Sequence, residues 1–319
     1  MILKKDLLFF ARILFSFTLF YITGCSDITS EYFTNGLEQY KKGEYSLAER
    51  SFTLAIKEDS SNALVFNQRG KVYFKLNRYL KAERDFTQAI SLNKKFVNAY
   101  LNRSKIKIIK NKYDSALNDL NEANTINPKD EEVLFNRAYL KNIMNDQEGA
   151  ISDYDKLIII NSYNAKAYVN RGNLKGSLED HLGAITDFTI ALEIDPNNIF
   201  AFVNRGTDKA IIGDYDGAIE DFTSAIKLDS TDLELFFLRG DAFSISDNFK
   251  KAIIDFTKII DQDSLNGKAF YKRGLNYLQL KKNKTACSDL KRAGELGYYP
   301  AYEIINSYCK KVIRKKRKK

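Results

Sequence analysis

Apolar positions recur along most of the chain with the spacing of amphipathic helices, and the whole pattern returns at one fixed interval. Each period contains two helical patterns joined by a short turn, which we term helix A and helix B of a repeat. Eight periods of equal length follow one another without an insertion, and we term them R1 to R8. The predicted repeats span residues 29–62, 63–96, 97–130, 131–164, 165–198, 199–232, 233–266 and 267–300.

Three positions of the repeat each keep one size of side chain in all eight repeats. Position 20 is always alanine: Ala48, Ala82, Ala116, Ala150, Ala184, Ala218, Ala252 and Ala286. Position 8 is always small: Gly36, Gly70, Ser104, Ala138, Gly172, Gly206, Gly240 and Gly274. Position 24 is always large and apolar: Phe52, Phe86, Leu120, Tyr154, Phe188, Phe222, Phe256 and Leu290. Small residues let the two helices approach closely, and the large residue fills the space beside them. One hairpin cannot bury its apolar face alone, so we expect neighbouring hairpins to stack.

A repeat of roughly 34 residues that contains two helices resembles the tetratricopeptide repeat. The resemblance covers residues 29 to about 309. It implies an all-α solenoid, wound as a right-handed superhelix, in which the A helices line a concave groove. A further amphipathic segment over residues 301–313 is expected to be a capping helix, because a terminal repeat needs a solvent-facing closure.

Arginine and aspartate appear together at two positions of the repeat. Position 7 is arginine in R2 to R8: Arg69, Arg103, Arg137, Arg171, Arg205, Arg239 and Arg273. Position 23 is aspartate in the same repeats: Asp85, Asp119, Asp153, Asp187, Asp221, Asp255 and Asp289. R1 lacks both. This co-occurrence predicts structural ion pairs, within one repeat or across a junction, and bidentate arginine geometry suits such pairs. A row of arginines that binds a ligand is the alternative.

A row of asparagines marks position 6 of four consecutive repeats: Asn102, Asn136, Asn170 and Asn204. By resemblance to family members that grip a peptide main chain, these amides are candidate peptide ligands in the groove, since an amide both donates and accepts hydrogen bonds. Hydrogen bonds between neighbouring A helices are the alternative. Phe135, Tyr139 and Phe200 are candidate aromatic contacts of the same groove. Lysine recurs at position 11 of R3 to R6, and no function is assigned to it.

The net charge of +9 is concentrated at the ends of the chain. Residues 1–24 carry +2 and residues 310–319 carry +8, so residues 25–309 carry −1. A neutral body offers no extended basic surface to a phosphate backbone, which argues against nucleic acid as a partner.

The N-terminal segment over residues 1–24 has the pattern of an export signal. Lys4, Lys5 and Arg12 form a basic region, and residues 13–22 are apolar but too few to span a bilayer. Ile22-Thr23-Gly24-Cys25 follows and looks like the lipid-attachment box of a bacterial lipoprotein. We therefore predict a signal peptide over residues 1–24, lipidation of Cys25 and a short tether over residues 25–28. An ordinary cleavage site is the alternative. By resemblance to bacterial sorting rules, Ser26 suggests the outer membrane, so the expected location is the bacterial cell envelope.

Cys287 and Cys309 remain once Cys25 is assigned to lipid. They lie at equal distances from the turn near residues 297–299, so an antiparallel arrangement brings them to the same level. An exported compartment permits oxidation, and we predict either a disulfide or two buried thiols. The basic residues that follow belong to a tail over residues 314–319, which is either a solvated tail or a segment attracted to anionic surfaces.

Sequence motifs for catalysis are not recognised. The single histidine, His181, is predicted to be a surface turn residue, and no metal-binding spacing or phosphate loop occurs. We therefore expect no enzyme activity, no cofactor and no metal. The expected function is a membrane-anchored adaptor that binds proteins or extended peptides in its groove. The alternative is an exported factor that engages anionic surfaces or glycans through its basic tail.

Overall fold

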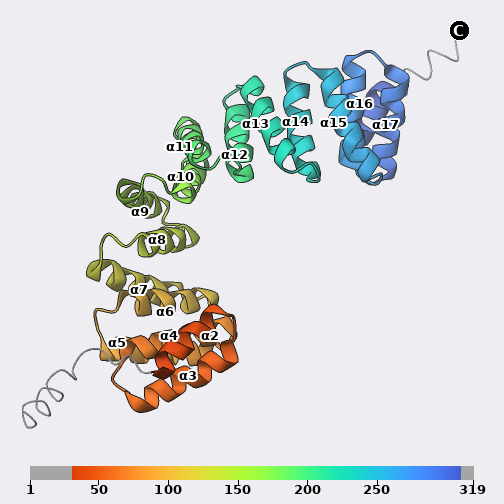
Figure 1. The fold of residues 1–319 in the computed structure, drawn as a ribbon. Coiled ribbons are helices and arrows are strands. Elements are labelled where there is room, and N and C mark those ends of the chain that lie inside the picture. Colours follow the sequence, from red (N-terminus) through yellow and green to blue (C-terminus); the bar gives the residue numbers. More distant parts are fainter. Residues whose placement is uncertain (1–30, 310–319) are drawn as a thin grey trace, which may run out of the picture. The chain divides into compact units, whose positions relative to one another are not determined.

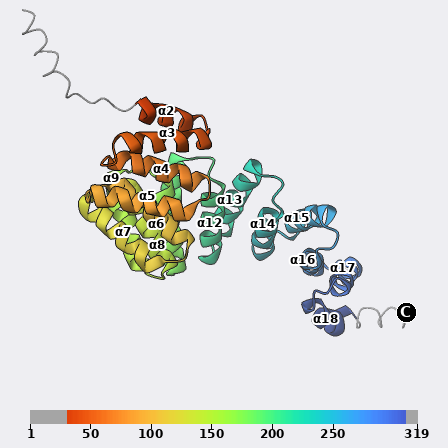
Figure 2. The ribbon, with the colours of Figure 1, turned by 90° about the horizontal axis from the view of Figure 1, so that it is seen from below.

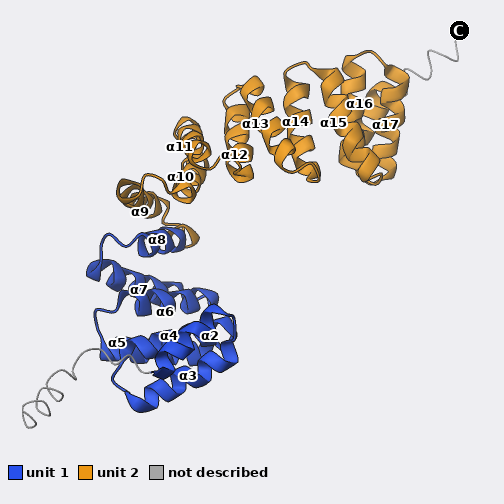
Figure 3. Cartoon of the chain, in the orientation of Figure 1, with its two compact units in different colours: residues 1–140 blue, residues 141–319 orange. Residues whose placement is uncertain are grey.

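The computed structural model describes residues 31–309, so residues 1–30, with Cys25, and residues 310–319 lie outside the described part. Within residues 31–309 the chain forms seventeen α-helices and one π-helical turn, without a β-strand (Figure 1). None of the described helices is long and apolar enough to cross a bilayer. The chain divides into two compact units, residues 1–140 and residues 141–319 (Figure 3).

The N-terminal unit contains three helical hairpins and most of a seventh helix. The hairpins are α2 with α3, α4 with α5, and α6 with α7, and the last helix is α8. Their bounds are α2 Glu31–Lys41, α3 Tyr45–Glu58, α4 Ala63–Lys75, α5 Tyr79–Leu92, α6 Val97–Ile109, α7 Tyr113–Ile126 and α8 Glu131–Ile143. Helix α3 also packs on α4, and α5 packs on α6, so these hairpins stack.

The C-terminal unit repeats this arrangement. Its helices are α9 Gln147–Ile160, α10 Ala165–Ser177, α11 His181–Ile194, α12 Ile199–Ile211, α13 Tyr215–Leu228, α14 Leu233–Ile245, α15 Phe249–Gln262, α16 Gly267–Gln279 and α17 Asn283–Glu295. From α12 to α17 the hairpins follow one another in chain order in both Figure 1 and Figure 2. In R2 to R8 every helix A, from α4 to α16, begins at position 1 of its repeat, so the observed helices keep the predicted period.

The core of each hairpin depends on contact between positions 8 and 24. A Cβ atom added to Gly70 would lie 2.6 Å from Cε1 of Phe86, and the same distance separates such an atom at Gly36 from Phe52. Both phenylalanines are fully buried. Atoms at 2.6 Å overlap, so a side chain at Gly36 or Gly70 would displace the phenylalanine ring of helix B.

The turn between helices A and B uses a left-handed backbone at position 15. Gly43 and Gly213 have φ of +80° and +86° there, and six residues other than glycine have φ between +56° and +65°. These are Asn77, Asn111, Asn145, Glu179, Asp247 and Lys281. Asparagine tolerates this region better than most residues, whereas glutamate and lysine have no local hydrogen bond to offset the steric cost.

The predicted capping helix over residues 301–313 begins as an α-helix and changes its helix type within the described residues. Helix α18 spans only Pro300–Ile304, and the chain continues as a π-helical turn, η1, over Ile305–Cys309. Pro300 suits the first turn of a helix because its missing N–H has no partner to lose there. The π-helical turn packs on α17, and there Cys309 is joined to Cys287 with a Cα–Cα distance of 5.7 Å. The remaining residues of the predicted cap lie outside the described part.

Candidate functional site

Arginine at position 7 forms a two-pronged ion pair with aspartate at position 23 of the same repeat. In R2, Nε and Nη2 of Arg69 donate to Oδ2 and Oδ1 of Asp85 at 2.7 and 2.8 Å. The same pairing joins Arg103 to Asp119, Arg171 to Asp187, Arg205 to Asp221, Arg239 to Asp255 and Arg273 to Asp289. In these repeats helix A therefore pairs with helix B of the same repeat, and not across a junction.

The third nitrogen of each arginine reaches back to the preceding repeat. Nη1 of Arg205 donates to Oγ1 of Thr189 at 3.0 Å, and Nη1 of Arg137 donates to Oδ1 of Asn121 at 3.3 Å. The acceptor always stands at position 25, sixteen residues before the arginine: Thr53, Thr87, Asn121, Asp155, Thr189, Thr223 and Thr257. Each arginine therefore joins two repeats. Sequence reasoning missed this contact, although position 25 is polar throughout R1 to R7.

Lysine at position 11 is a second partner of the buried aspartate. Lys107 Nζ lies 2.7 Å from Asp119, and Lys141, Lys175 and Lys209 lie 2.9 Å from Asp153, Asp187 and Asp221. The sequence analysis assigned no function to these lysines. These lysines recur in repeats that also contain the aspartate, and this co-occurrence could have predicted the contact.

The ion-pair ladder is buried, and its charges compensate one another. Burial opposes the charge of Arg171, but the carboxylates of Asp187 and Asp155 raise its pKa above the usual value by hydrogen bonding and Coulomb attraction. All three nitrogens of this guanidinium already have partners in the chain. The guanidinium group of Arg171 therefore holds neighbouring repeats together. This favours structural ion pairs over a row of arginines that binds a ligand.

Each asparagine at position 6 donates a hydrogen bond inside the chain. Asn102 donates to Asn67 at 3.1 Å and Asn204 to Asn173 at 2.7 Å, both on the preceding helix A. Asn136 instead donates to the carbonyl of Glu132, and Asn170 to the hydroxyl of Tyr154. The partners differ from repeat to repeat, so the local contacts of these four amides are not uniform along the row.

Two of the three predicted aromatic contacts are exposed. The residue Phe200, on α12, is 77% exposed, and Tyr139, on α8, is 48% exposed. Phe135 is half-buried on α8. A large apolar side chain that remains in water on helix A is available to a partner.

A cavity of about 180 Å³ opens between the A helices of R1, R2 and R3. Its lining comes from α2, α4 and α6, with one ring from α5: Tyr40, Lys71, Phe74, Lys75, Phe86, Asn102 and Lys105. Asn102, one of the predicted asparagines of the row, is among the lining residues. We term this the helix-A cavity.

The helix-A cavity combines aromatic walls with lysine ammonium groups. Tyr40 contacts Tyr45, and Phe74 contacts Tyr79, both edge-on with ring centroids 5.6 and 5.7 Å apart. Nζ of Lys71 lies 5.3 Å from the centre of the Tyr40 ring. Burial raises the pKa of the Tyr40 hydroxyl above its usual value. The walls are held by ring contacts, and the positive charges are set around them.

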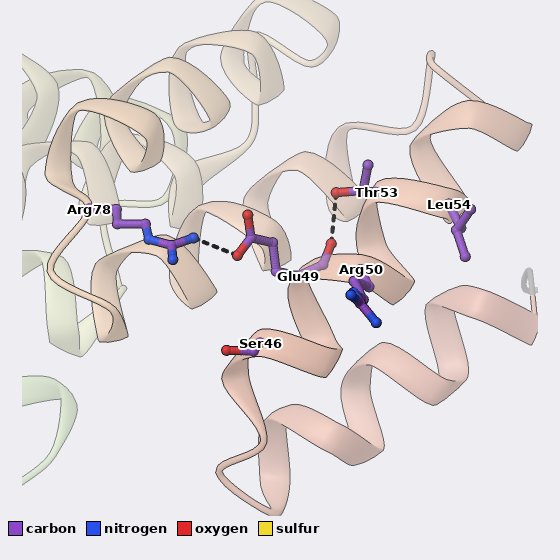
Figure 4. Close-up of a pocket in the computed structure, with 6 residues that line it drawn as sticks. All are labelled: Ser46, Glu49, Arg50, Thr53, Leu54 and Arg78. Carbon is purple, nitrogen blue, oxygen red and sulfur yellow. Dashed lines mark hydrogen bonds and ion pairs between the residues drawn. The ribbon is translucent and has the colours of Figure 1, made fainter.

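A larger hollow of about 580 Å³ lies beside helix B of R1 (Figure 4). The lining residues are Ser46, Glu49, Arg50, Thr53, Leu54 and Arg78. Three of its polar residues interact with one another: Arg78 pairs with Glu49 at 2.6 Å, and Thr53 Oγ1 donates to the carbonyl of Glu49 at 2.7 Å.

His181 differs from the expected surface turn residue. It is the first residue of α11, it is half-buried, and its Nδ1 lies 2.7 Å from Oδ1 of Asp208 on the next helix A. The pair joins R5 to R6. Within residues 31–309 no group of three His, Cys, Asp or Glu side chains is placed to hold a metal ion.

Comparison with known proteins identifies the repeat. Two sequence profiles of the tetratricopeptide repeat match this chain, one at residues 63–96 and the other at residues 97–130 and 165–198. A comparison with curated proteins finds no significant match.

Solved structures of tetratricopeptide proteins share the fold at low sequence identity. The C-terminal part of a repeat-containing protein from Cytophaga hutchinsonii is 18% identical, with a TM-score of 0.65, over 75% of this chain and 98% of that one. PilF of Pseudomonas aeruginosa is 16% identical, with a TM-score of 0.58, over 66% and 96%. YrrB, described as having an unusual peptide-binding site, is 18% identical, with a TM-score of 0.52, over 58% and 96%. Residues 63–96, 97–130 and 165–198 are tetratricopeptide repeats, and the chain is an all-α helical repeat solenoid.

Proposed function

We propose that this protein is a membrane-anchored adaptor whose helix-A surfaces bind proteins or extended peptides in the bacterial cell envelope. Tetratricopeptide repeats generally mediate interactions between proteins, and solenoids of this kind typically act as scaffolds without catalysis. The family therefore supports binding as the function, and the features of this chain decide which surface carries it.

One observation favours the helix-A surfaces over the rest of the molecule. The helix-A cavity combines aromatic walls, an amide and three ammonium groups that belong to no part of the ion-pair ladder. By contrast, in the hollow beside helix B of R1 the carboxylate of Glu49 is paired with Arg78, and no aromatic ring is among its lining residues. Aromatic side chains with a few polar groups are typical of surfaces that bind polypeptides.

Site-specific photo-crosslinking in cells tests the binding surface. A photoreactive amino acid replaces Phe200 on helix A or, as a matched control, Leu182 on helix B, which is 69% exposed in the same unit. We expect discrete adducts from the position of Phe200 that persist when the envelope is washed with high salt, because apolar contacts are not screened. Adducts from the Leu182 position alone would assign binding to the other surface.

The membrane anchor is part of the same proposal and rests on the sequence. Cys25 follows a basic region, an apolar segment and two small residues, as lipid attachment requires. Two acyl chains and an amide-linked third would hold the protein stably, since each buried methylene contributes about 0.8 kcal/mol.

A Cys25→Ser variant should move from the membrane fraction to the soluble fraction, as measured by fractionation and by labelling with a fatty acid. A Cys287→Ser variant serves as the control, because it also removes one cysteine and should stay in the membrane fraction. Retention of Cys25→Ser in the membrane would contradict the lipid anchor. Separation of outer from inner membranes on a density gradient then tests the location suggested by Ser26.

A further inference from the structure

The outward-facing side of helix B in R1 and R2 exposes leucines next to basic side chains. Leu47 and Leu54 on α3 are 46% and 39% exposed, and Leu80 on α5 is 69% exposed. Arg50 is also exposed and follows Leu47 by three residues, so it lies on the same face of α3. We term this the R1–R2 outer surface, and its exposed residues are Leu47, Arg50, Leu54, Lys57, Leu80, Lys81 and Arg84. Apolar residues beside basic ones are typical of helices that lie in the interface of a bilayer.

The positive charge of the R1–R2 outer surface is not neutralised by the protein. Within residues 31–309, Arg50, Lys57 and Arg84 have no carboxylate as an ion-pair partner. The one exposed acid on α3 and α5 is Glu58, at the end of α3. Residues 31–96 carry 12 Lys and Arg against 8 Asp and Glu, a net charge of +4. Such an excess attracts an anionic partner.

Helix B of other repeats exposes a different set of side chains. The exposed ionisable residues of α7 and α11, helix B of R3 and R5, are all acidic: Asp114, Glu122 and Glu193. On α11, Leu182 is 69% exposed, as Leu80 is on α5, but no basic residue is exposed on that helix. The R1–R2 outer surface is therefore distinguished by the combination of exposed leucines with basic residues, and not by exposed leucine alone.

The hollow beside helix B of R1 opens in this surface and places donors next to a leucine. Arg50, Ser46 and Leu54 are among its lining residues (Figure 4). Its volume of about 580 Å³ equals roughly twenty water molecules at about 30 Å³ each, which is enough for a phosphate with its glycerol. A guanidinium group can donate two hydrogen bonds to one phosphate. The hollow thus has the chemistry to hold a lipid headgroup at the edge of an apolar surface.

The proposed lipid anchor would bring the same surface close to a membrane. Residues 26–30 separate Cys25 from Glu31, where α2 begins, and a chain of that length reaches at most about 20 Å. The start of α2 lies beside the second half of α3, because the ring centroids of Phe33 and Phe52 are 5.9 Å apart. The anchored end of R1 is therefore the end that carries Leu54.

We infer that the R1–R2 outer surface lies against an anionic lipid bilayer, with its leucines at the level of the glycerol groups and its basic side chains at the lipid phosphates. The inference rests on the proposed lipid anchor and adds the surface by which the first repeats meet the membrane. A nucleic acid or an acidic protein would match the charge alone, whereas the exposed leucines and the short tether favour lipid. The helix-A surfaces stay available to a protein partner.

Tryptophan fluorescence of the lipidated protein in vesicles tests the inference. The chain contains no tryptophan, so Leu80→Trp introduces a single reporter, and Leu182→Trp is a matched control with the same exposure at the same position of the repeat. The vesicles contain phosphatidylcholine with or without phosphatidylglycerol, and some of the lipid carries bromine atoms, which quench tryptophan on contact. We expect quenching of the Leu80→Trp protein when phosphatidylglycerol is present, and little quenching of the Leu182→Trp protein. Equal quenching of the two reporters, or none, would overturn the inference.

Charge variants in the Leu80→Trp protein show which basic residues hold the surface to the bilayer. Arg50→Gln with Lys57→Gln should shift the equilibrium between bound and free forms of the surface about tenfold, because each basic residue near an anionic surface contributes several-fold. Lys250→Gln with Lys258→Gln removes the same charge from exposed residues of α15, helix B of R7, and should shift it less than about twofold. An equal loss in both double variants would contradict the inference. Circular dichroism checks that both remain folded.

Failure of the anchor gives a different result from failure of this inference. Release of the protein from vesicles of phosphatidylcholine alone would contradict the anchor, whereas quenching of Leu80→Trp by vesicles with phosphatidylglycerol would still support the surface. Absence of that quenching rejects the surface, whether or not the vesicles retain the protein. In cells, a photoreactive amino acid in place of Leu54 should form adducts with lipid. Adducts with protein alone would show that the surface faces an acidic protein and would overturn the inference.

Discussion

At the scale of single residues, one buried aspartate per repeat organises the contacts between helices. Asp221 is 3% exposed and accepts from Nε and Nη2 of Arg205 at 3.0 and 2.6 Å, while Lys209 lies 2.9 Å away. Arg205 also donates to Thr189 of the preceding repeat. A carboxylate without these partners would not be tolerated inside the protein, because the loss of hydration would remain uncompensated.

Asp221→Asn should therefore destabilise the protein by about 3–5 kcal/mol, because two cations lose their counter-charge at a largely buried site. The measurement is the urea dependence of the circular dichroism signal. Asp216→Asn is the matched control, since Asp216 lies exposed on the same helix, α13, and should change stability by less than about 0.5 kcal/mol. A similar shift of the two urea midpoints would show that the buried ion pair contributes little.

At the scale of the elements, the turn between helices A and B depends on one backbone conformation. Position 15 is left-handed at eight places in the described chain, but only Gly43 and Gly213 are glycine there. Glu179, with φ of +65°, joins α10 to α11 without the advantage that glycine or asparagine has in this region. The hairpin thus accepts local strain because the packing of its two helices decides the conformation of the turn.

Replacing Glu179 with glycine should stabilise the protein by about 0.5–1 kcal/mol, because the steric cost at positive φ is removed. The reverse change, Gly213→Ala, should destabilise it by about 1 kcal/mol, since a Cβ atom there meets no neighbour and only the backbone conformation is penalised. Thermal unfolding of both variants checks the prediction. The two variants should change the unfolding temperature in opposite directions. A loss of stability in Glu179→Gly would show that the glutamate side chain makes a stabilising contact of its own.

At the scale of the whole molecule, stability is expected to be local, because each repeat contacts only its neighbours. The disulfide between Cys287 and Cys309 joins positions separated by 22 in the sequence and closes a loop that contains most of α17, α18 and η1. It ties η1 to α17 at the end of the solenoid, where no further repeat of the described chain covers the apolar face. A cross-link at this place should protect the last repeats from opening.

Removal of this disulfide with Cys287→Ser and Cys309→Ser should cost about 2–4 kcal/mol, and the cost should stay near the C-terminal end. Hydrogen exchange should become faster in α16, α17 and α18 but stay unchanged in α2 to α7. Faster exchange along the whole chain would instead mean that the repeats unfold as one cooperative unit.

The regular part of this protein could be predicted from its sequence alone. The fixed period, with its small and large positions, indicates paired helices and a helical repeat solenoid, because close helix packing permits few residue types at Gly70 or Phe86. The co-occurrence of arginine and aspartate indicates their pairing for the same reason, since a buried charge needs a partner. These packing and charge constraints act between residues at fixed separations in each repeat, so the same residue types recur with the period of the repeat.

Only the tertiary structure decided which contacts depart from that period. It joins His181 to Asp208 and brings Tyr40, Lys71 and Lys105 from three repeats around one cavity. It also gives the four asparagines of position 6 different partners. These groups meet through the stacking of neighbouring hairpins, and the side chains that they meet differ from repeat to repeat. A surface that binds one partner needs such differences, because a strictly repeated surface cannot distinguish one place along the solenoid from another.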